Sequence, residues 1–210
     1  IISNVLKTAI EANIREVFVA AEDQEIIDEV KKNGGHSILT KNHHETGTDR
    51  IFEALKKLGK SDIELVMNLQ GDEPLMNIED IKYLHKQMIK TKSSIGTLAS
   101  NILDKDLYDN SNVVKVITNE SLENSKFPEA VNFTRKSSKM VKNTYHHLGI
   151  YCYKLDILKK FVSLDRSKNE IKNKLEQLRA LDNNLKINVA LAKESPIGVD
   201  TNEDLMAIKK

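Results

Sequence analysis

Short apolar runs alternate with helical patterns along the first hundred residues, and this alternation restricts the fold more than any other feature. Helical spacing covers 3–13, 24–32, 49–58 and 78–90, and strand-like runs cover 15–20, 37–40, 65–70 and 95–99. Strands separated by helices in this way predict a parallel sheet with right-handed crossovers. The pattern is typical of α/β domains that bind ligands at the carboxyl ends of their strands.

The middle of the chain changes character. Strand-like runs over 113–118, 130–134 and 146–153 follow one another with little helix between them. We therefore predict one α/β domain over residues 1–210 with a β-rich excursion at about 110–155. A helix over 173–181, with Leu175, Leu178 and Leu181 in the core, a strand over 187–191 and a helix over 201–208 complete the pattern.

Composition excludes several classes of protein. The 32 Lys and Arg residues against 31 Asp and Glu residues give a net charge of +1, so no strong field attracts nucleic acid or anionic lipid. The apolar runs are far shorter than the roughly 20 residues that span a bilayer. The single cysteine, Cys152, lies in a strand-like run and is predicted to be a buried apolar residue in a cytoplasmic protein.

The strand over 65–70 ends abruptly in Gly71, Asp72 and Glu73. Gly71 lets the backbone turn where Asp72 emerges, and by itself Asp72 could either hold a divalent cation or cap the next helix. A second acid, Asp200, follows a similar turn near the end of the chain. Two bare carboxylates about 4 Å apart would repel by roughly 4 kcal/mol at an effective dielectric constant of about 20. A Mg²⁺ ion would reverse the sign of that interaction, so we predict a Mg²⁺ site at Asp72 and Asp200.

The loop from His43 to Arg50 is a second candidate site. Gly47 frees the backbone and Thr48 is a possible helix cap, while Arg50 and the first amides of the helix offer donors to an anion or a base carbonyl. The alternative is a capped helix with a surface arginine. His43 and His44 also suggest a metal, but no carboxylate or cysteine spacing supports one.

Five segments occur in a characteristic order: Thr46–Arg50, Asn68–Pro74, His147–Tyr151, Leu175–Leu181 and Gly198–Thr201. In series they resemble the 3-deoxy-manno-octulosonate cytidylyltransferases, which make CMP-Kdo for lipopolysaccharide. The resemblance implies a Rossmann-like nucleotidyltransferase fold, with a mixed, mostly parallel sheet flanked by helices, and a homodimer. The family begins with a strand and a triphosphate-binding loop that are missing from this chain, which starts at the helix expected after them.

The resemblance also implies roles for individual residues. In this family the anomeric hydroxyl of Kdo attacks the α-phosphorus of CTP and releases pyrophosphate. The implied Mg²⁺ ligands and catalytic residues are Asp72 and Asp200, the CTP contacts are Thr48, Arg50, Gln70 and Gly71, and the Kdo contacts are Arg135, His147, Tyr151, Glu176 and Gln177. Arg135 matches a family arginine that forks onto the Kdo carboxylate, although the residues after it depart from the family pattern.

Alternatives remain open at this stage. His147 and Tyr151 are four residues apart and could simply line one face of a strand, and Glu176 and Gln177 could lie on an exposed helix face. The function could be cytidylyl transfer to another acidic sugar. Without the triphosphate-binding loop, the chain could also be a non-catalytic remnant.

Overall fold

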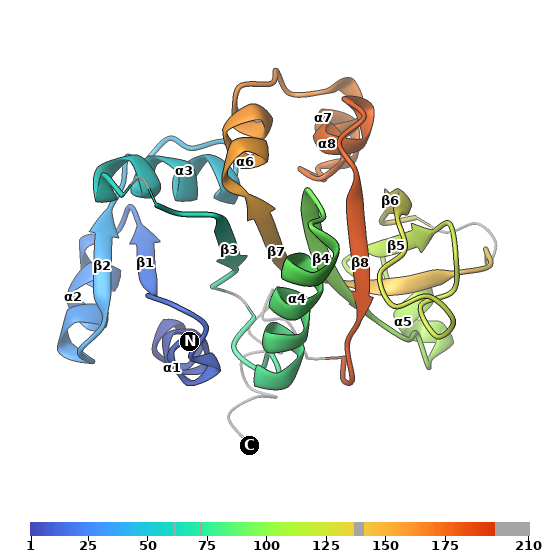
Figure 1. Cartoon of the computed structure of the whole chain (residues 1–210), viewed down its shortest axis with the longest axis horizontal. Helices are drawn as coiled ribbons and strands as arrows, with labels where there is room; N and C mark the ends of the chain where they lie inside the picture. Colours follow the sequence, from blue (N-terminus) through green and yellow to red (C-terminus); the bar gives the residue numbers. More distant parts are fainter. Residues whose placement is uncertain (61, 72, 137–140, 196–210) are drawn as a thin grey trace. The chain divides into compact units, whose positions relative to one another are not determined.

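The structure, a computed structural model, describes residues 1–60, 62–71, 73–136 and 141–195. The chain divides into two compact units, both drawn in Figure 1. The first includes Ile1–Glu64 and Asn68–Lys82, and the second includes Leu65–Met67 and Tyr83–Ser195. The single domain with an excursion at about 110–155 stays a prediction.

The first unit is built around a β-α-β crossover. Its elements are α1 (Ile2–Ala12), β1 (Phe18–Ala21), α2 (Gln24–Lys32), β2 (His36–Leu39) and α3 (Gly47–Leu58). β1 and β2 pair in parallel and lie side by side in Figure 1. A Cβ atom on Gly35 would lie 2.6 Å from Cδ2 of Leu6 and 3.0 Å from Cγ1 of Val30. The glycine therefore allows α1 and α2 to pack tightly against the start of β2.

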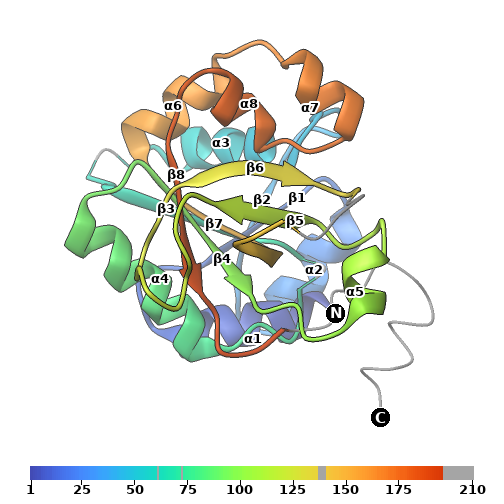
Figure 2. The same cartoon turned by 90° about the vertical axis from the view of Figure 1, so that its right-hand side faces the viewer.

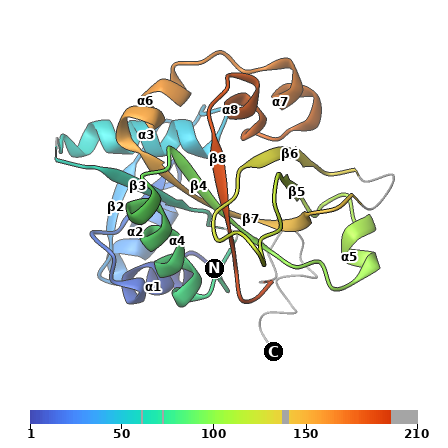
Figure 3. The same ribbon diagram turned by 45° about the vertical axis from the view of Figure 1, so that its right-hand side comes forward.

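The second unit carries the larger sheet, whose strand order is β6-β5-β7-β4-β8, with β3 also paired to β7 (Figure 2). The strands are β3 (Leu65–Leu69), β4 (Ile95–Ser100), β5 (Lys115–Thr118), β6 (Ala130–Thr134), β7 (Thr144–Lys154) and β8 (Ile187–Leu191). The helices are α4 (Ile78–Thr91), α5 (Lys105–Asp109), α6 (Leu155–Val162), α7 (Lys168–Asn173) and α8 (Leu178–Asp182). The last two residues of β3 and the first five of α4 are counted with the first unit. In Figures 1 to 3, α6, α7 and α8 gather at one end of this unit.

The sheet is mixed, which confirms the predicted α/β class. β7 runs antiparallel to β4 and β5, and β5 runs antiparallel to β6, whereas β4 and β8 are parallel. The β-rich middle of the chain therefore pairs directly with β4 rather than forming a layer of its own. Every residue of β4 is buried. At Gly96 an added Cβ would lie 2.6 Å from Sδ of Met88 on α4, so this helix packs closely on the strand.

One predicted helix is wrong in its boundaries. The pattern favoured a continuous helix over 173–181, but Lys174 adopts a left-handed conformation with φ of 53° and ends α7, and α8 begins only at Leu178. Leu175 and Leu178 are core residues as expected, while Leu181 is only half-buried. Helices α5, α6 and most of α7 were not predicted. The helix expected over 201–208 lies outside the described residues.

A buried ion pair explains how the two short helices stay together. Arg179 on α8 donates from Nε and Nη2 to the two carboxylate oxygens of Glu170 on α7, at 2.9 and 2.7 Å. Both side chains are almost completely buried, and the guanidinium carbon lies 4.7 Å from the ring centre of Phe161. The pair ties α7 to α8 and closes the intervening loop, residues 174–177.

No helix in the described ranges is both long and apolar enough to cross a membrane.

We predict that Arg179→Met lowers the free energy of unfolding by about 3–5 kcal/mol, because it leaves the Glu170 carboxylate buried without its main partner. Arg166→Ala is the matched control, since Arg166 binds the same carboxylate at 3.1 Å from a more exposed position and should cost less than about 1 kcal/mol. Urea denaturation followed by circular dichroism measures both. Equal losses of unfolding free energy in the two variants would contradict the assignment of Arg179 as the main partner of Glu170.

Candidate active site

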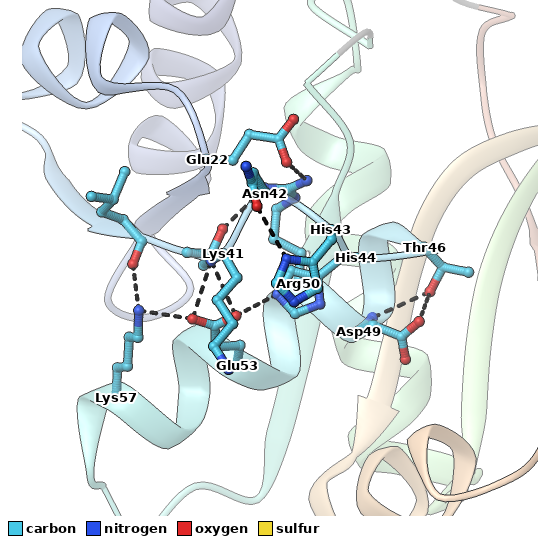
Figure 4. Close-up of polar contacts among 12 residues, drawn as sticks. Glu22, Lys41, Asn42, His43, His44, Thr46, Asp49, Arg50, Glu53 and Lys57 are labelled. Atoms are coloured by element: carbon cyan, nitrogen blue, oxygen red, sulfur yellow. Dashed lines mark hydrogen bonds and ion pairs between the residues drawn. The ribbon is translucent and has the colours of Figure 1, made fainter.

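The start of α3 is organised by Thr46. Its hydroxyl accepts a hydrogen bond from the backbone N–H of Asp49 at 3.3 Å and donates to the Asp49 carboxylate at 2.7 Å (Figure 4). Thr46 is therefore the helix cap, and the suggestion that Thr48 caps the helix is wrong. Thr48 lies inside the first turn and is 2% exposed. Its role as a CTP contact stays a prediction.

Arg50 anchors the same helix to the two parallel strands. Nη1 donates to the hydroxyl of Thr40, directly after β2, at 3.0 Å, and Nη2 donates to the carboxylate of Glu22, directly after β1, at 2.6 Å (Figure 4). A guanidinium has five N–H groups. Donors remain for a ligand, but the side chain is already held in place by the protein.

Hydrogen bonds to Glu53 hold the loop that precedes α3. Its carboxylate accepts hydrogen bonds from Nζ of Lys57 at 2.8 Å, from a ring nitrogen of His44, and from the backbone N–H of Lys41 at 3.2 Å (Figure 4). The bond from Lys57 is the largest cause that lowers the pKa of Glu53 to about 2, with His44 and Lys41 adding to it against the effect of desolvation. His44 is thus a partner of Glu53. In the described ranges no group of three His, Cys, Asp or Glu residues could hold a metal ion.

Gln70 and Gly71 follow β3 in the first unit. Gln70 is half-buried, and its carbonyl accepts a hydrogen bond from the backbone N–H of Glu73 at 3.3 Å. A Cβ atom on Gly71 would meet only Cδ1 of Ile2, at 3.8 Å, so space lies beside this backbone. Asp72 and Asp200 lie outside the described residues, and the Mg²⁺ site at these two residues stays a prediction.

The second unit brings His147 and Tyr151 together through an irregularity in β7. Thr97 pairs with Tyr151, but the next residue of β4, Leu98, pairs with Leu148. Four residues of regular strand would separate the two side chains by about 13 Å. Their ring centres lie 5.3 Å apart. His147 and Tyr151 therefore do more than line one face of a strand, because the bulge brings the two side chains into contact.

Burial keeps both of these side chains neutral. Desolvation, with a smaller contribution from His146, lowers the pKa of His147 to about 3. Burial, followed by Tyr153 and Glu176, raises the pKa of Tyr151 well above its usual value. The Tyr151 hydroxyl is buried and has no hydrogen-bond partner among the described residues. A buried unpaired hydroxyl is costly, which makes it a candidate contact for a polar ligand.

Glu176 and Gln177 lie in the loop that the Glu170–Arg179 pair closes. The charge of Glu176 acts on Tyr151 in the same cluster. Gln177 is only 9% exposed and Glu176 is half-buried. The alternative that they form an exposed helix face is therefore wrong.

Arg135 is placed just after β6, where Nη1 donates to the carbonyl of Asn112 at 2.9 Å. Phe133, two residues earlier on β6, packs its ring edge-on against His147 at 5.2 Å. The sequence reasoning missed Lys115, which is completely buried and donates to the carbonyls of Asn110 and Arg135 at 2.6 and 3.1 Å. A lysine inside an apolar run was the available signal.

The remaining missed residue is Thr97 on β4, whose hydroxyl lies 3.0 Å from Nε2 of His147. Cys152 is buried on β7 as predicted, and desolvation raises the pKa of its thiol to about 12. A thiol in that environment stays protonated and inert.

Comparison with known proteins defines the class first. A family model described as Cytidylyltransferase matches residues 1–187. A 3-deoxy-manno-octulosonate cytidylyltransferase of Thermodesulfovibrio yellowstonii is 42% identical over 94% of this chain and 81% of its own length. The one of Afipia carboxidovorans is 39% identical over 100% of this chain and 85% of its own length.

A solved structure agrees with these relatives. The structure of CMP:2-keto-3-deoxy-manno-octonic acid synthetase complexed with CTP superposes with a TM-score of 0.86 at 31% identity, covering 99% of this chain and 85% of that one. The chain therefore belongs to the cytidylyltransferase family, and within it to the 3-deoxy-manno-octulosonate cytidylyltransferases. The predicted nucleotidyltransferase fold is confirmed.

We predict a pH-dependent contribution of Glu53 to stability. Its pKa falls from 4.5 to about 2 on folding, so the ionised form stabilises the protein above pH 4.5 and the effect disappears as pH falls from 4.5 toward 2. Chemical denaturation at several pH values should show wild type more stable than Glu53→Gln at pH 7, with the difference shrinking below pH 4.5. Glu11→Gln, in an exposed pair with Lys7, is the control. A difference in the free energy of unfolding between wild type and Glu53→Gln that does not change with pH would contradict the prediction.

Proposed function

We propose that the protein transfers the cytidylyl group of CTP to Kdo. The anomeric hydroxyl oxygen of Kdo attacks the α-phosphorus, the bond from that phosphorus to the bridging oxygen breaks, and pyrophosphate leaves as the hydroxyl proton is lost. The products are CMP-Kdo and pyrophosphate. The observation that carries this proposal is the match to curated cytidylyltransferases of that sugar acid over nearly the whole chain.

The described residues support separate binding regions for the two substrates, one in each unit. Thr48, Arg50, Gln70 and Gly71, proposed as the CTP contacts, all belong to the first unit. The proposed Kdo contacts Arg135, His147, Tyr151, Glu176 and Gln177 all belong to the second. The first unit offers the guanidinium of Arg50 for a polyanionic ligand, and the second offers polar side chains, among them the Glu176 carboxylate, for a polyhydroxylated one. Phosphoryl transfer depends mainly on positioning and charge stabilisation.

The proposed cofactor is Mg²⁺, with Asp72 and Asp200 as its ligands. Two carboxylates form a hard oxygen donor set of the kind that binds Mg²⁺ together with substrate phosphates. When bound, the ion would neutralise charge on the phosphates and favour ionisation of the attacking hydroxyl. The residues of the chain would bind and orient the two substrates around it.

The cellular setting is part of the same proposal. CMP-Kdo formation would supply lipopolysaccharide synthesis, and the resemblance to the family supports a homodimer in the cytoplasm.

The direct test incubates the full-length protein with CTP, Mg²⁺ and Kdo and follows pyrophosphate release and CMP-Kdo by mass spectrometry. We expect turnover with Kdo and at least about tenfold less with neuraminic acid, because a pocket that bonds specific hydroxyls rejects analogues that misplace them. The same preparation should sediment as a dimer. Preference for neuraminic acid would overturn the sugar assignment, and no turnover with either acid would overturn the function.

Removal of the metal tests the cofactor separately. Chelation with EDTA should abolish pyrophosphate release and added Mg²⁺ should restore it. Asp72→Asn should abolish release at any Mg²⁺ concentration while its thermal melting stays close to that of wild type. Asp156→Asn, an exposed carboxylate on α6, is the matched control and should remain active. Unchanged turnover in Asp72→Asn would remove this residue from the mechanism.

A further inference from the structure

Thr97 is a fully buried polar residue in a strand that is otherwise packed with small and apolar side chains. Its hydroxyl oxygen lies 2.6 Å from the carbonyl of Ile150, 3.4 Å from the carbonyl of Leu148 and 3.0 Å from Nε2 of His147. A hydroxyl has one proton to donate. The distance to Ile150 is that of a strong O–H···O bond, so the proton lies toward that carbonyl.

In the hydrogen bond between His147 and Thr97, the imidazole ring must then be the donor. Because the only hydrogen on the Thr97 oxygen is directed at Ile150, this oxygen accepts, and Nε2 of His147 is the donor. Burial keeps the imidazole neutral, so it carries one N–H, which is at Nε2. Nδ1 keeps its lone pair. No hydrogen bond joins Nδ1 to another described residue.

The bulge in β7 creates this arrangement. Because the register shifts between Thr97 and Leu98, the carbonyls of Leu148 and Ile150 and the ring of His147 all come within reach of one hydroxyl. Phe133 and Tyr151 pack against two sides of the imidazole, at ring-centre distances of 5.2 and 5.3 Å. Packing therefore holds the plane of the ring, and Thr97 decides which nitrogen carries the proton.

We propose that Thr97 is a positioning residue that holds His147 as the Nε2–H tautomer, so that Nδ1 accepts a hydrogen bond from a hydroxyl group of the sugar acid. This inference rests on the proposed function for the identity of the ligand. The Tyr151 ring packs against the same imidazole, and its hydroxyl, buried without a partner in the described part of the chain, supplies the complementary group. One acceptor and one hydroxyl at fixed places select a polyhydroxylated substrate over one lacking a hydroxyl there.

The first measurement reads the tautomer directly. Long-range ¹H–¹⁵N spectra of the full-length protein, labelled with ¹⁵N-histidine and free of substrate, should show His147 neutral with its proton on Nε2. A His147→Asn variant identifies the signal by its loss. Thr97→Val, nearly the same shape without the hydroxyl, should shift His147 toward the other tautomer or a mixture, and Thr97→Ser should keep the wild-type spectrum.

The second measurement is a steady-state comparison of the same variants. Thr97→Val should raise KM for Kdo about three- to tenfold, the equivalent of one hydrogen bond, and leave KM for CTP within about twofold. Thr97→Ser should restore KM for Kdo. A purely structural loss would change both constants together and would not be rescued in this selective way. If Thr97→Val folds poorly, judged by thermal melting, the wild-type and Thr97→Ser spectra still decide the tautomer.

Three outcomes would overturn the inference. These are a proton on Nδ1 of His147 in wild type, an unchanged spectrum and unchanged KM for Kdo in Thr97→Val, and an equal rise of KM for CTP and for Kdo in Thr97→Val. Failure of the proposed function looks different. In that case wild type turns over neither substrate pair, which removes the sugar acid as the ligand, while the spectra still report whether Thr97 sets the tautomer.

Discussion

The antiparallel pairing of β4 with β7, and its interruption by a bulge, is the constraint on which the second unit depends. β4 is buried along its whole length and pairs with β8 on its other edge. It therefore cannot shift its register without exposing core side chains. The extra residues in β7 have to be absorbed locally, and the place where they are absorbed is where His147 and Tyr151 meet.

Buried polar groups then fix the segments around that point. Lys115 holds the backbone of Arg135, the Glu170–Arg179 pair closes the loop that carries Glu176, and Thr97 bonds His147. Each of these groups would be costly if left unpaired, so each has few alternative positions. The rings of Tyr151, Tyr153 and Phe161 contact one another in succession from the cluster to Arg179, which couples the packing of the ion pair to that of the candidate site.

In the first unit, exposed or half-buried polar groups fix the positions of the neighbouring segments. Arg50 reaches back to residues that follow β1 and β2, and Glu53 collects three donors from the loop and the helix. These contacts shape the start of α3 around side chains that the sequence marked only as a cap and an arginine. The carboxyl ends of parallel strands are where α/β folds place ligands, so the anchoring lies where a nucleotide contact is expected.

Local pattern was sufficient for most of the elements. Helix α2 and strands β6 and β8 occur with the predicted bounds, because helical or strand-like spacing of their apolar residues needs no distant partner. The class of fold and the family also followed from short segments such as Thr46–Arg50. The break at Lys174, where the backbone is left-handed, did not, and the pair that holds α7 against α8 joins residues nine apart in sequence.

The amino-acid sequence by itself determined which residues are apolar and where strands and most helices form, and it carried the motifs of the family. Only the tertiary structure decided that the β-rich middle joins the main sheet and that His147 contacts Tyr151 and Thr97. The physical reason is that bulges, buried ion pairs and tautomers depend on contacts between residues far apart along the chain. Periodicity and turn signals report only on near neighbours.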